Sequence, residues 1–237
     1  MEDISCWETK FKACVYSNKL LDKLLRLNEK TDNKINIIEI KKAIYYAKKY
    51  HGDQKRLSGE PYYSHPLEIA YNIADCFFTT DILVTSILHD TIEDTKLTEK
   101  MIEYIFGPTI ASQVESLTRI KPDRKISSAE MVKQLYAQKK FDLLVVKIFD
   151  RLHNMQTIAS KSPEKIKRCL EETIKNFISL SIYLSESMPK MQLDQKITNL
   201  CYKSLSKKPH MLTNLEMSLN DDFQLPFLIF QSEKYQN

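Results

Sequence analysis

The chain has 237 residues, of which only 3 are Gly and 8 are Pro, whereas average usage is about 7% Gly and about 5% Pro. A Gly-rich phosphate loop or a dinucleotide-binding fingerprint needs two or three glycines within about eight residues. Gly52, Gly59 and Gly107 do not have that spacing, so the composition nearly excludes both loops and disfavours all-β architectures built on glycine turns. The 35 Lys and Arg against 31 Asp and Glu leave a formal net charge of +4, an excess too small to indicate nucleic acid as a partner.

Signals for secretion or membrane insertion are not evident. Residues 1–10 include acidic side chains where a signal peptide needs a basic and then an apolar stretch. The most apolar runs, 82–88 and 143–149, are far shorter than the roughly 20 residues of a membrane-spanning helix. The 5 cysteines are scattered and form no Cys-x-x-Cys pair. We therefore expect a cytoplasmic protein with reduced thiols and no membrane association.

The first strong helical pattern places Ile37, Ile40, Ile44 and Ala47 on one face. It ends in a basic stretch followed by Gly52, which is typical of a helix C-terminus. Turn-forming residues over 54–64 predict a loop, and Pro66 suits the first position of the next helix. Further helices are predicted over 66–78, 80–92, 97–106 and 109–119, with Gly107 and Pro108 marking one end and the next start.

The second half of the chain continues the helical pattern. A polar link over 121–127 precedes two helices within 128–159, which are expected to break near Lys139 and Lys140. Another helix is predicted over 163–186, with a common apolar stripe made of Ile166, Leu170, Ile174, Phe177 and Leu184. No strand alternation appears, so the predicted fold is an all-α, compact multi-helix bundle.

Composition divides the chain into three parts. Residues 1–33 are rich in Lys and Leu and are predicted to form an N-terminal helical appendage, and residues 34–187 form the main domain. Residues 188–237 lose the strong period and form a C-terminal extension. Its apolar segment, 223–230, is expected to pack on the core as a strap, with an oligomer contact as the alternative.

The decisive polar cluster is the stretch His89-Asp90-Thr91-Ile92-Glu93-Asp94. On a continuous helix, His89 and Glu93 are four residues apart, so these polar groups converge at the end of an apolar segment. Carboxylates and an imidazole beside a core repel and desolvate one another unless a cation neutralises them. A metal ion resolves that conflict. The alternative is a surface helix end whose charges are solvated.

Two further segments favour the metal interpretation. His65 lies at a junction between a loop and a helix, and Asp150 follows the apolar run 143–149. Together with His89 and Asp90 they supply two nitrogen and two carboxylate ligands and no cysteine. This set suits a divalent ion such as Mn²⁺ or Fe²⁺, with Zn²⁺ as an alternative.

Three longer strings resemble one family. They are 56–67 (RLSGEPYYSHPL), 89–95 (HDTIEDT) and 150–157 (DRLHNMQT). They are similar to motifs of the HD superfamily of metal-dependent phosphohydrolases, and in particular to the hydrolase domain of the RelA/SpoT alarmone enzymes, over roughly residues 37–186. The resemblance implies Mn²⁺-dependent hydrolysis of (p)ppGpp, a guanine nucleotide with a 3′ diphosphate, to pyrophosphate and GDP or GTP.

The resemblance also implies roles for individual residues. His65, His89, Asp90 and Asp150 correspond to the metal ligands, and Glu93 and Asp94 to the pair that orients and deprotonates the attacking water. Nucleotide contacts are implied for Arg56, which would stack on guanine, and for Ser58, Asn154 and Thr157. From their charge alone, Lys55, Lys161 and Arg168 are further candidates for phosphate contacts, although exposed cations usually face solvent.

Two departures from the family motifs concern phosphate binding. Leu57 and Gln156 stand where family members often carry a cation, so another substrate such as NADPH stays open, as does a module that binds the alarmone without hydrolysing it. The 50 residues after 187 are too few for the synthetase domain found in bifunctional relatives. The expected partner is a small-molecule guanine nucleotide, and the oligomeric state is left open.

Overall fold

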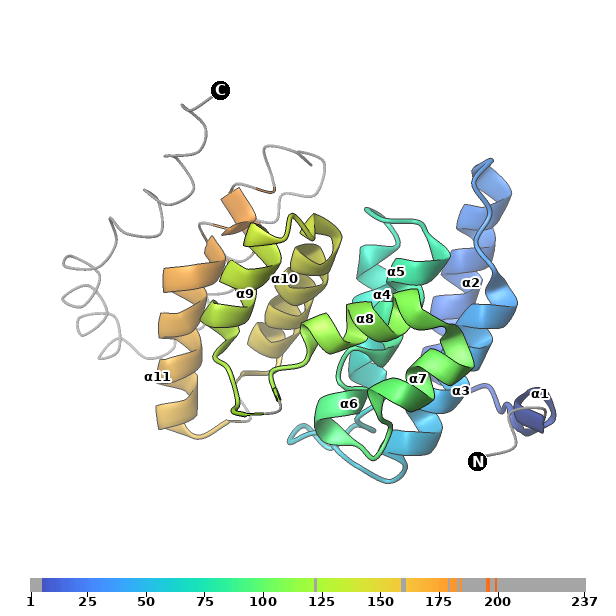
Figure 1. Cartoon of the computed structure of the whole chain (residues 1–237), viewed down its shortest axis with the longest axis horizontal. Coiled ribbons are helices and arrows are strands. Elements are labelled where there is room, and N and C mark those ends of the chain that lie inside the picture. The colour runs from blue at the N-terminus through green and yellow to red at the C-terminus, as the bar shows by residue number, and fades with distance from the viewer. Residues whose placement is uncertain are drawn as a thin grey trace. The chain divides into compact units, whose positions relative to one another are not determined.

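The computed structural model describes residues 6–121, 123–158 and 161–178, and beyond them only 180–182, 184, 195–196 and 199 (Figure 1). Within this part of the chain the secondary structure is helical, with two isolated β-bridges and no strand. The all-α prediction is confirmed. The chain divides into two compact units, Met1–Phe149 and Asp150–Asn237. The predicted boundaries at 34 and 188 stay a prediction.

Helices α1 to α9 belong to the first unit, and α10 runs across the division between the units. The bounds are α1 Trp7–Lys10, α2 Val15–Lys30, α3 Ile37–His51, α4 Ser64–Ile73, α5 Thr80–Leu88, α6 Thr91–Asp94, α7 Glu99–Phe106, α8 Pro108–Leu117, α9 Ser128–Ala137 and α10 Phe141–Gln156. The second unit adds α11 Pro163–Glu172 and a π-helical turn, η3, over Thr173–Ile178. The longest of these helices, α2 and α10, have 16 residues, and none of the described helices meets the length and apolarity needed to cross a membrane.

Backbone conformation explains most of the helix boundaries. Gly52 (φ 50°) ends α3 and Gly107 (φ 88°) separates α7 from α8, as predicted. The break between α9 and α10 lies at Lys139, which adopts φ 56° although it is not glycine. Helix α4 ends at Ile73 instead of residue 78, because the chain tightens there: the Cys76 amide donates to the Ile73 carbonyl, three residues back, at 2.8 Å.

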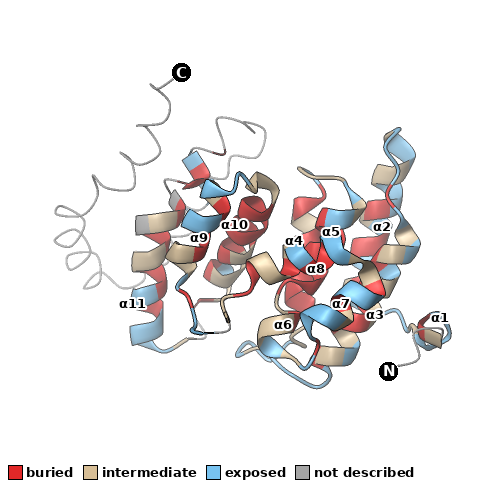
Figure 2. Ribbon diagram, in the orientation of Figure 1, coloured by how far each residue is buried: buried red, intermediate tan, exposed pale blue. Residues whose placement is uncertain are grey.

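Helix α5 is the centre of the first unit. All of its residues from Ile82 to Leu88 are buried, and the helix packs against α3, α4 and α8. In Figure 2 the buried residues gather on helix faces that meet neighbouring helices, and the exposed ones lie on the opposite faces. Because α5 is enclosed on several sides, the residues that follow its C-terminal end start from a fixed position.

Helix α2 contributes to the same core. Leu20, Leu21 and Leu24 are buried on its inner face, which packs against α3 and α4. Lys19 and Lys23 form ion pairs with Glu68 and Asp75, both at 2.8 Å. Residues 15–30 are thus helical, as predicted, and their apolar face is covered by α3 and α4 of the same unit.

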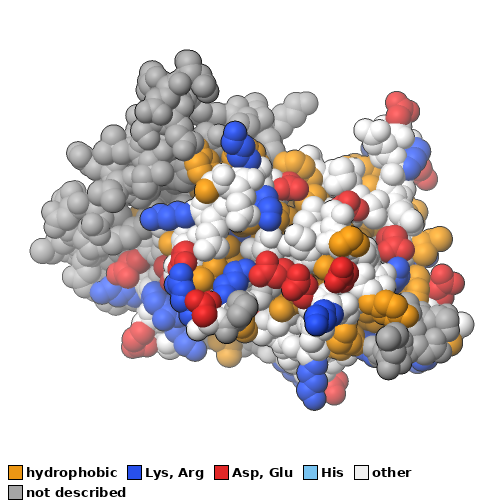
Figure 3. Space-filling view, viewed as in Figure 1, with side chains coloured by type: hydrophobic (Ala, Val, Ile, Leu, Met, Phe, Trp, Pro, Cys, Tyr) orange, Lys and Arg blue, Asp and Glu red, His pale blue; other side chains and the backbone are white. Residues whose placement is uncertain are grey.

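The second unit keeps the predicted apolar stripe. Its members are buried, namely Ile166, Leu170, Ile174, Phe177 and Leu184. Arg151 lies over the Phe177 ring at 4.4 Å and pairs with Glu172 at 3.2 Å. The segment 223–230 and nearly all of 188–237 lie outside the described residues. On the face seen in Figure 3, Lys and Arg alternate with Asp and Glu and do not gather into one basic patch.

The packing of α2 is testable with two adjacent leucines. Replacing the fully buried Leu24 with Ala removes core contacts, and we expect the free energy of unfolding in urea to fall by about 3 kcal/mol. The control, Leu25→Ala, removes a side chain that is 46% exposed and is expected to cost less than about 0.5 kcal/mol. Equal losses in the two variants would contradict the inward orientation of Leu24.

Candidate active site

The polar cluster begins where α5 ends, and the structure corrects the predicted continuous helix over 80–92. Helix α5 ends at Leu88 and the short α6 begins at Thr91, so His89 and Asp90 lie in a turn between them. Side chains bind the last carbonyls of α5: His89 Nδ1 lies 2.8 Å from the Ser86 carbonyl, and the Thr91 hydroxyl donates to the Leu88 carbonyl at 2.6 Å. These bonds stop the helix, because they satisfy the carbonyls that a further turn would have used.

Two buried imidazoles face Asp90. His65, from the start of α4, and His89 are each 1% exposed, and their ring centroids are 5.5 Å apart. Asp90 Oδ1 lies 3.0 Å from His89 Nε2, and Asp90 Oδ2 lies 3.5 Å from His65 Nε2. The carboxylate therefore lies against both rings.

The tautomer of His89 follows from its partner. A carbonyl oxygen only accepts, so Nδ1, bound to the Ser86 carbonyl, carries a proton. In the neutral ring Nε2 then presents its lone pair toward Asp90 Oδ1. A lone pair and a carboxylate oxygen 3.0 Å apart repel unless a proton or a metal cation lies between them. An imidazole whose outer nitrogen is fixed by a carbonyl is the usual arrangement of a metal-ligating histidine.

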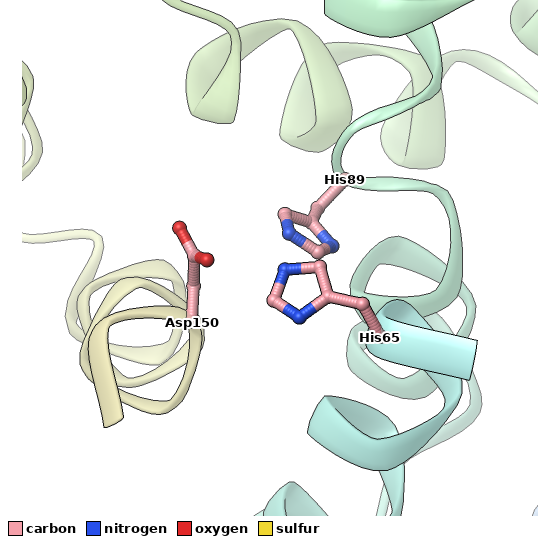
Figure 4. A group of neighbouring side chains, drawn as sticks. All are labelled: His65, His89 and Asp150. Carbon is pink, nitrogen blue, oxygen red and sulfur yellow. The ribbon is translucent and has the colours of Figure 1, made fainter. Parts of the chain in front are cut away.

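One group of potential metal ligands is found within the described residues. It consists of His65, His89 and Asp150, whose ligand atoms all lie within 4.8 Å of one another (Figure 4). Asp150 follows Phe149 directly in α10. The group contains three of the four predicted ligands, and the fourth, Asp90, contacts both histidines. Nitrogen and carboxylate donors without cysteine fit a divalent cation such as Mn²⁺, Fe²⁺ or Zn²⁺.

Glu93 is held by two cations. Its carboxylate accepts from Arg119 Nη2 at 2.8 Å and pairs with Lys125 Nζ at 2.7 Å. Burial alone would raise the pKa of Glu93, but the hydrogen bonds and charges of Lys125 and Arg119 outweigh that effect and hold the pKa below its ordinary value of 4.5. Glu93 is therefore a fixed, ionised carboxylate.

Asp94, the neighbouring residue, has a different environment. Its carboxylate accepts a hydrogen bond from the Tyr62 hydroxyl at 2.6 Å, and its backbone carbonyl accepts one from Gln54 at 2.9 Å. Asp94 keeps access to solvent, and the partial loss of water around it raises its pKa. The bond from Tyr62 opposes that rise, while the charges of Asp90 and Glu93 add to it. Asp94 thus accepts a proton more readily than an ordinary aspartate.

The loop before α4 carries three of the predicted nucleotide contacts. Arg56 is half-buried, and its guanidinium carbon lies 5.9 Å from the centre of the Tyr62 ring. Lys55 and Ser58 are exposed. Gly59 (φ 90°) completes the turn, in which its amide donates to the Arg56 carbonyl at 2.9 Å. The turn therefore sets the backbone at Arg56 and leaves Lys55 and Ser58 facing solvent.

The remaining predicted contacts belong to the second unit. The Asn154 amide donates to Asp150 Oδ1 at 2.6 Å, so this side chain also orients a predicted ligand. The Thr157 hydroxyl donates to the His153 carbonyl at 3.2 Å. Lys161 is half-buried and Arg168 is exposed. The roles of these residues toward a nucleotide stay predictions.

Three further residues at the site, Tyr62, Arg119 and Lys125, were not predicted from the sequence. Tyr62 stood within the quoted motif, but no spacing rule connects it with Asp94, 32 residues later. Arg119 and Lys125 lie in the link between α8 and α9, where exposed cations are common. Two adjacent carboxylates indicate that cations lie nearby, but the sequence alone does not identify those cations as Arg119 and Lys125.

Comparison with known proteins identifies the family. The HD domain family model matches residues 43–181, which is more than half of the chain. The chain belongs to the HD domain family. A solved structure, described as a metazoan orthologue of SpoT that hydrolyses ppGpp, is similar in fold, with a TM-score of 0.54 and 18% sequence identity over 70% of this chain and 94% of that chain.

Curated relatives match this HD domain chain over much of its length. The GTP pyrophosphokinase rsh of Brucella ovis is 33% identical over 80% of this chain and 28% of its own. The guanosine-3′,5′-bis(diphosphate) 3′-pyrophosphohydrolase of Aquifex aeolicus is 36% identical over 60% of this chain and 21% of its own. A protein of Mycoplasma pneumoniae, named a probable enzyme of the latter kind, is 33% identical over 71% of this chain and 24% of its own. The motif resemblance is confirmed, and the chain spans about a quarter of the length of these relatives.

The ion pairs of Glu93 predict how the stability of the protein depends on pH. Because the pKa of Glu93 is lowered in the fold, its ion pairs stabilise the protein above pH 4.5, and that contribution is lost as pH falls through the lowered pKa. Lys125 and Arg119 are partly exposed, so we expect Glu93→Gln to lower the free energy of unfolding by only about 1 kcal/mol at pH 7.

Urea unfolding at a series of pH values from 7 down to 3 checks this expectation. The difference between wild type and Glu93→Gln should narrow as the pH falls below 4.5, whereas the control, Glu103→Gln on the exposed face of α7, should show no such trend. A variant as stable as wild type at pH 7 would show that the ion pairs do not stabilise the fold.

Proposed function

We propose that this chain is a metal-dependent phosphohydrolase that removes pyrophosphate from the 3′ position of (p)ppGpp and leaves GDP or GTP. The observation that carries the proposal is the Glu93 and Asp94 pair beside the His65, His89 and Asp90 cluster. This arrangement combines a place for a cation with a base for an attacking water, which together are what phosphoryl hydrolysis needs. The names of the curated relatives support guanosine bis(diphosphate) as the substrate.

His65, His89, Asp90 and Asp150 are proposed to hold the cation, with Mn²⁺ as the preferred ion and Fe²⁺ or Zn²⁺ as alternatives. A divalent cation, when bound, neutralises charge on phosphoryl oxygens and makes water more acidic. The protein also fixes its ligands before the cation arrives: the Ser86 carbonyl orients His89, and the Asn154 amide holds Asp150.

Asp94 is proposed to take the proton from the attacking water. Its raised pKa suits a base, whereas Glu93, held ionised by two cations, suits the orientation of that water. The water oxygen bonds to the 3′ phosphorus, the bond between that phosphorus and the 3′ oxygen breaks, and the 3′ oxygen takes up a proton as pyrophosphate leaves.

Nucleotide contacts are proposed for residues in the loop before α4 and for residues of the second unit. Arg56 would stack on guanine through its planar guanidinium, and Ser58, Asn154 and Thr157 would contact the nucleotide. Lys55, Lys161 and Arg168 are proposed to contact phosphates.

Leu57, which is 71% exposed, stands where family members often carry a cation. The activity on NADPH should therefore be compared with that on ppGpp. A cytoplasmic location stays a prediction from the sequence.

The proposed activity predicts pyrophosphate release from ppGpp by the purified chain with Mn²⁺. Replacing Asp94 with Asn should lower kcat by about 10²–10⁴-fold, the range of a lost general base. The control is Asp81→Asn, a change of the same kind at an exposed position in the first turn of α5; it should keep kcat within about twofold. Pyrophosphate release from ppGpp and phosphate release from NADPH are measured side by side.

Three results would contradict the proposal. They are turnover of NADPH but not ppGpp, binding of ppGpp without turnover in saturating Mn²⁺, and wild-type activity in Asp94→Asn. The first would retain the phosphohydrolase and change its substrate, and the second would indicate a binding module.

Cation binding makes a prediction that needs no turnover. A cation that binds only the folded state stabilises it, so Mn²⁺ should raise the Tm of the wild type by several degrees and EDTA should reverse the shift. In His89→Ala the shift should disappear, whereas His153→Ala, outside the proposed ligand set, should retain it. Parallel titrations with Fe²⁺ and Zn²⁺ compare the three ions. An unchanged shift in His89→Ala would exclude His89 as a ligand.

A further inference from the structure

Asp94 is held differently from its neighbour Glu93. Two cations contact Glu93, but within the described part of the chain the Tyr62 hydroxyl is the only side-chain donor to the Asp94 carboxylate, at 2.6 Å. A hydroxyl that donates to a carboxylate at this distance makes a strong, directional hydrogen bond. The orientation of Asp94 therefore depends on the position of one phenol.

The Tyr62 ring is fixed by a buried histidine. His51, the last residue of α3, is 1% exposed, and its ring stacks on Tyr62 with centroids 4.7 Å apart and an interplanar angle of 22°. The backbone amide of Tyr62 donates to the Gln54 carbonyl at 2.8 Å. Stacking and the backbone bond together leave the phenol little freedom to move, and its hydroxyl points at Asp94.

Gln54 connects the same histidine to the backbone of Asp94. Its Nε2 donates to the Asp94 carbonyl at 2.9 Å, so its Oε1 is an acceptor, and His51 Nδ1 donates to that oxygen at 2.8 Å. Burial lowers the pKa of His51, which is consistent with a neutral ring that carries its proton on Nδ1. The end of α3 thus supports Asp94 twice, once at the backbone through Gln54 and once at the carboxylate through Tyr62.

We propose that Tyr62 is a positioning residue of the hydrolytic site, and that with His51 and Gln54 it fixes the carboxylate of Asp94 toward the attacking water. This inference rests on the proposed function, because it assigns to Tyr62 a role in the step that Asp94 performs. The hydrogen bonds from Gln54 and Tyr62 to Asp94 join the loop before α4 to α6, two segments that lie next to each other in the first unit (Figure 1).

Tyr62→Phe is the direct test, since it removes one oxygen and keeps the ring that stacks on His51. A base displaced by a fraction of an ångström to 1 Å loses up to about 100-fold in rate, so we expect kcat for ppGpp to fall by about 10–100-fold. KM for ppGpp should change by less than about twofold, because the hydroxyl is not assigned to the nucleotide. The hydroxyl also lies 3.4 Å from Asp90 Oδ2, a longer contact than the one to Asp94, so the assays are run at saturating Mn²⁺ to keep the proposed cation site filled.

The matched control is the adjacent Tyr63→Phe. The Tyr63 ring packs edge-on against Tyr16, with centroids 6.3 Å apart, and lies outside the proposed site. It should keep kcat within about twofold. A purely structural role for the Tyr62 hydroxyl would instead lower Tm and change KM along with kcat.

Gln54→Ala keeps the inference testable if Tyr62→Phe does not fold. Gln54 is exposed, and its replacement removes the donor to the Asp94 carbonyl and the acceptor of His51 Nδ1 but leaves the Tyr62 hydroxyl in place. We expect kcat to fall by about 3–10-fold at unchanged KM. A wild-type kcat in Tyr62→Phe would overturn the positioning role of Tyr62 and leave the proposed function intact. If Tyr62→Phe is unfolded, a wild-type kcat in Gln54→Ala would have the same meaning. A wild type that releases no pyrophosphate from ppGpp would overturn both.

Discussion

Negative charge is crowded at the end of α5, and the site depends on how that charge is compensated. Asp90, Glu93 and Asp94 lie within five residues beside two buried imidazoles. Like charges this close raise one another's pKa values unless each has its own partner. The shortest contacts of the three carboxylates differ: Asp90 lies against an imidazole, Glu93 against cations and Asp94 against a phenol hydroxyl. Three chemically similar side chains thereby lie in three different electrostatic environments.

The core places these partners by enclosing α5. Helices α3, α4 and α8 pack around it, and one end of each lies near the cluster: His51 ends α3, His65 is at the start of α4, and Arg119 follows α8. The side chains that stop α5 at Leu88 also turn the chain so that α6 begins at Thr91, directly after Asp90. Apolar burial and hydrogen bonding of terminal carbonyls are therefore the direct causes of the site's geometry, and glycine is needed mainly at helix ends.

The sequence allowed prediction of what depends on local pattern. Helical periodicity located the buried face of α11, and Gly52 and Gly107 marked helix ends that the structure contains. The turn at His89 was missed because it depends on side-chain bonds to the carbonyls of Ser86 and Leu88, and periodicity does not register such bonds. The partners of Glu93 and Asp94 were missed for a related reason: Arg119 and Tyr62 are 26 and 32 residues away, so only tertiary packing brings them there.

The two adjacent acidic residues are not interchangeable, and electrostatics explains why. A base must release its charge when it accepts a proton, and Glu93 would then lose the attraction of Arg119 and Lys125, which stabilises only its ionised form. Asp94 gains instead, since protonation relieves its repulsion from Asp90 and Glu93. The cost of protonation therefore differs between neighbouring carboxylates. A neutral donor such as Tyr62 suits Asp94, because it orients the carboxylate without adding a positive charge that would oppose its protonation.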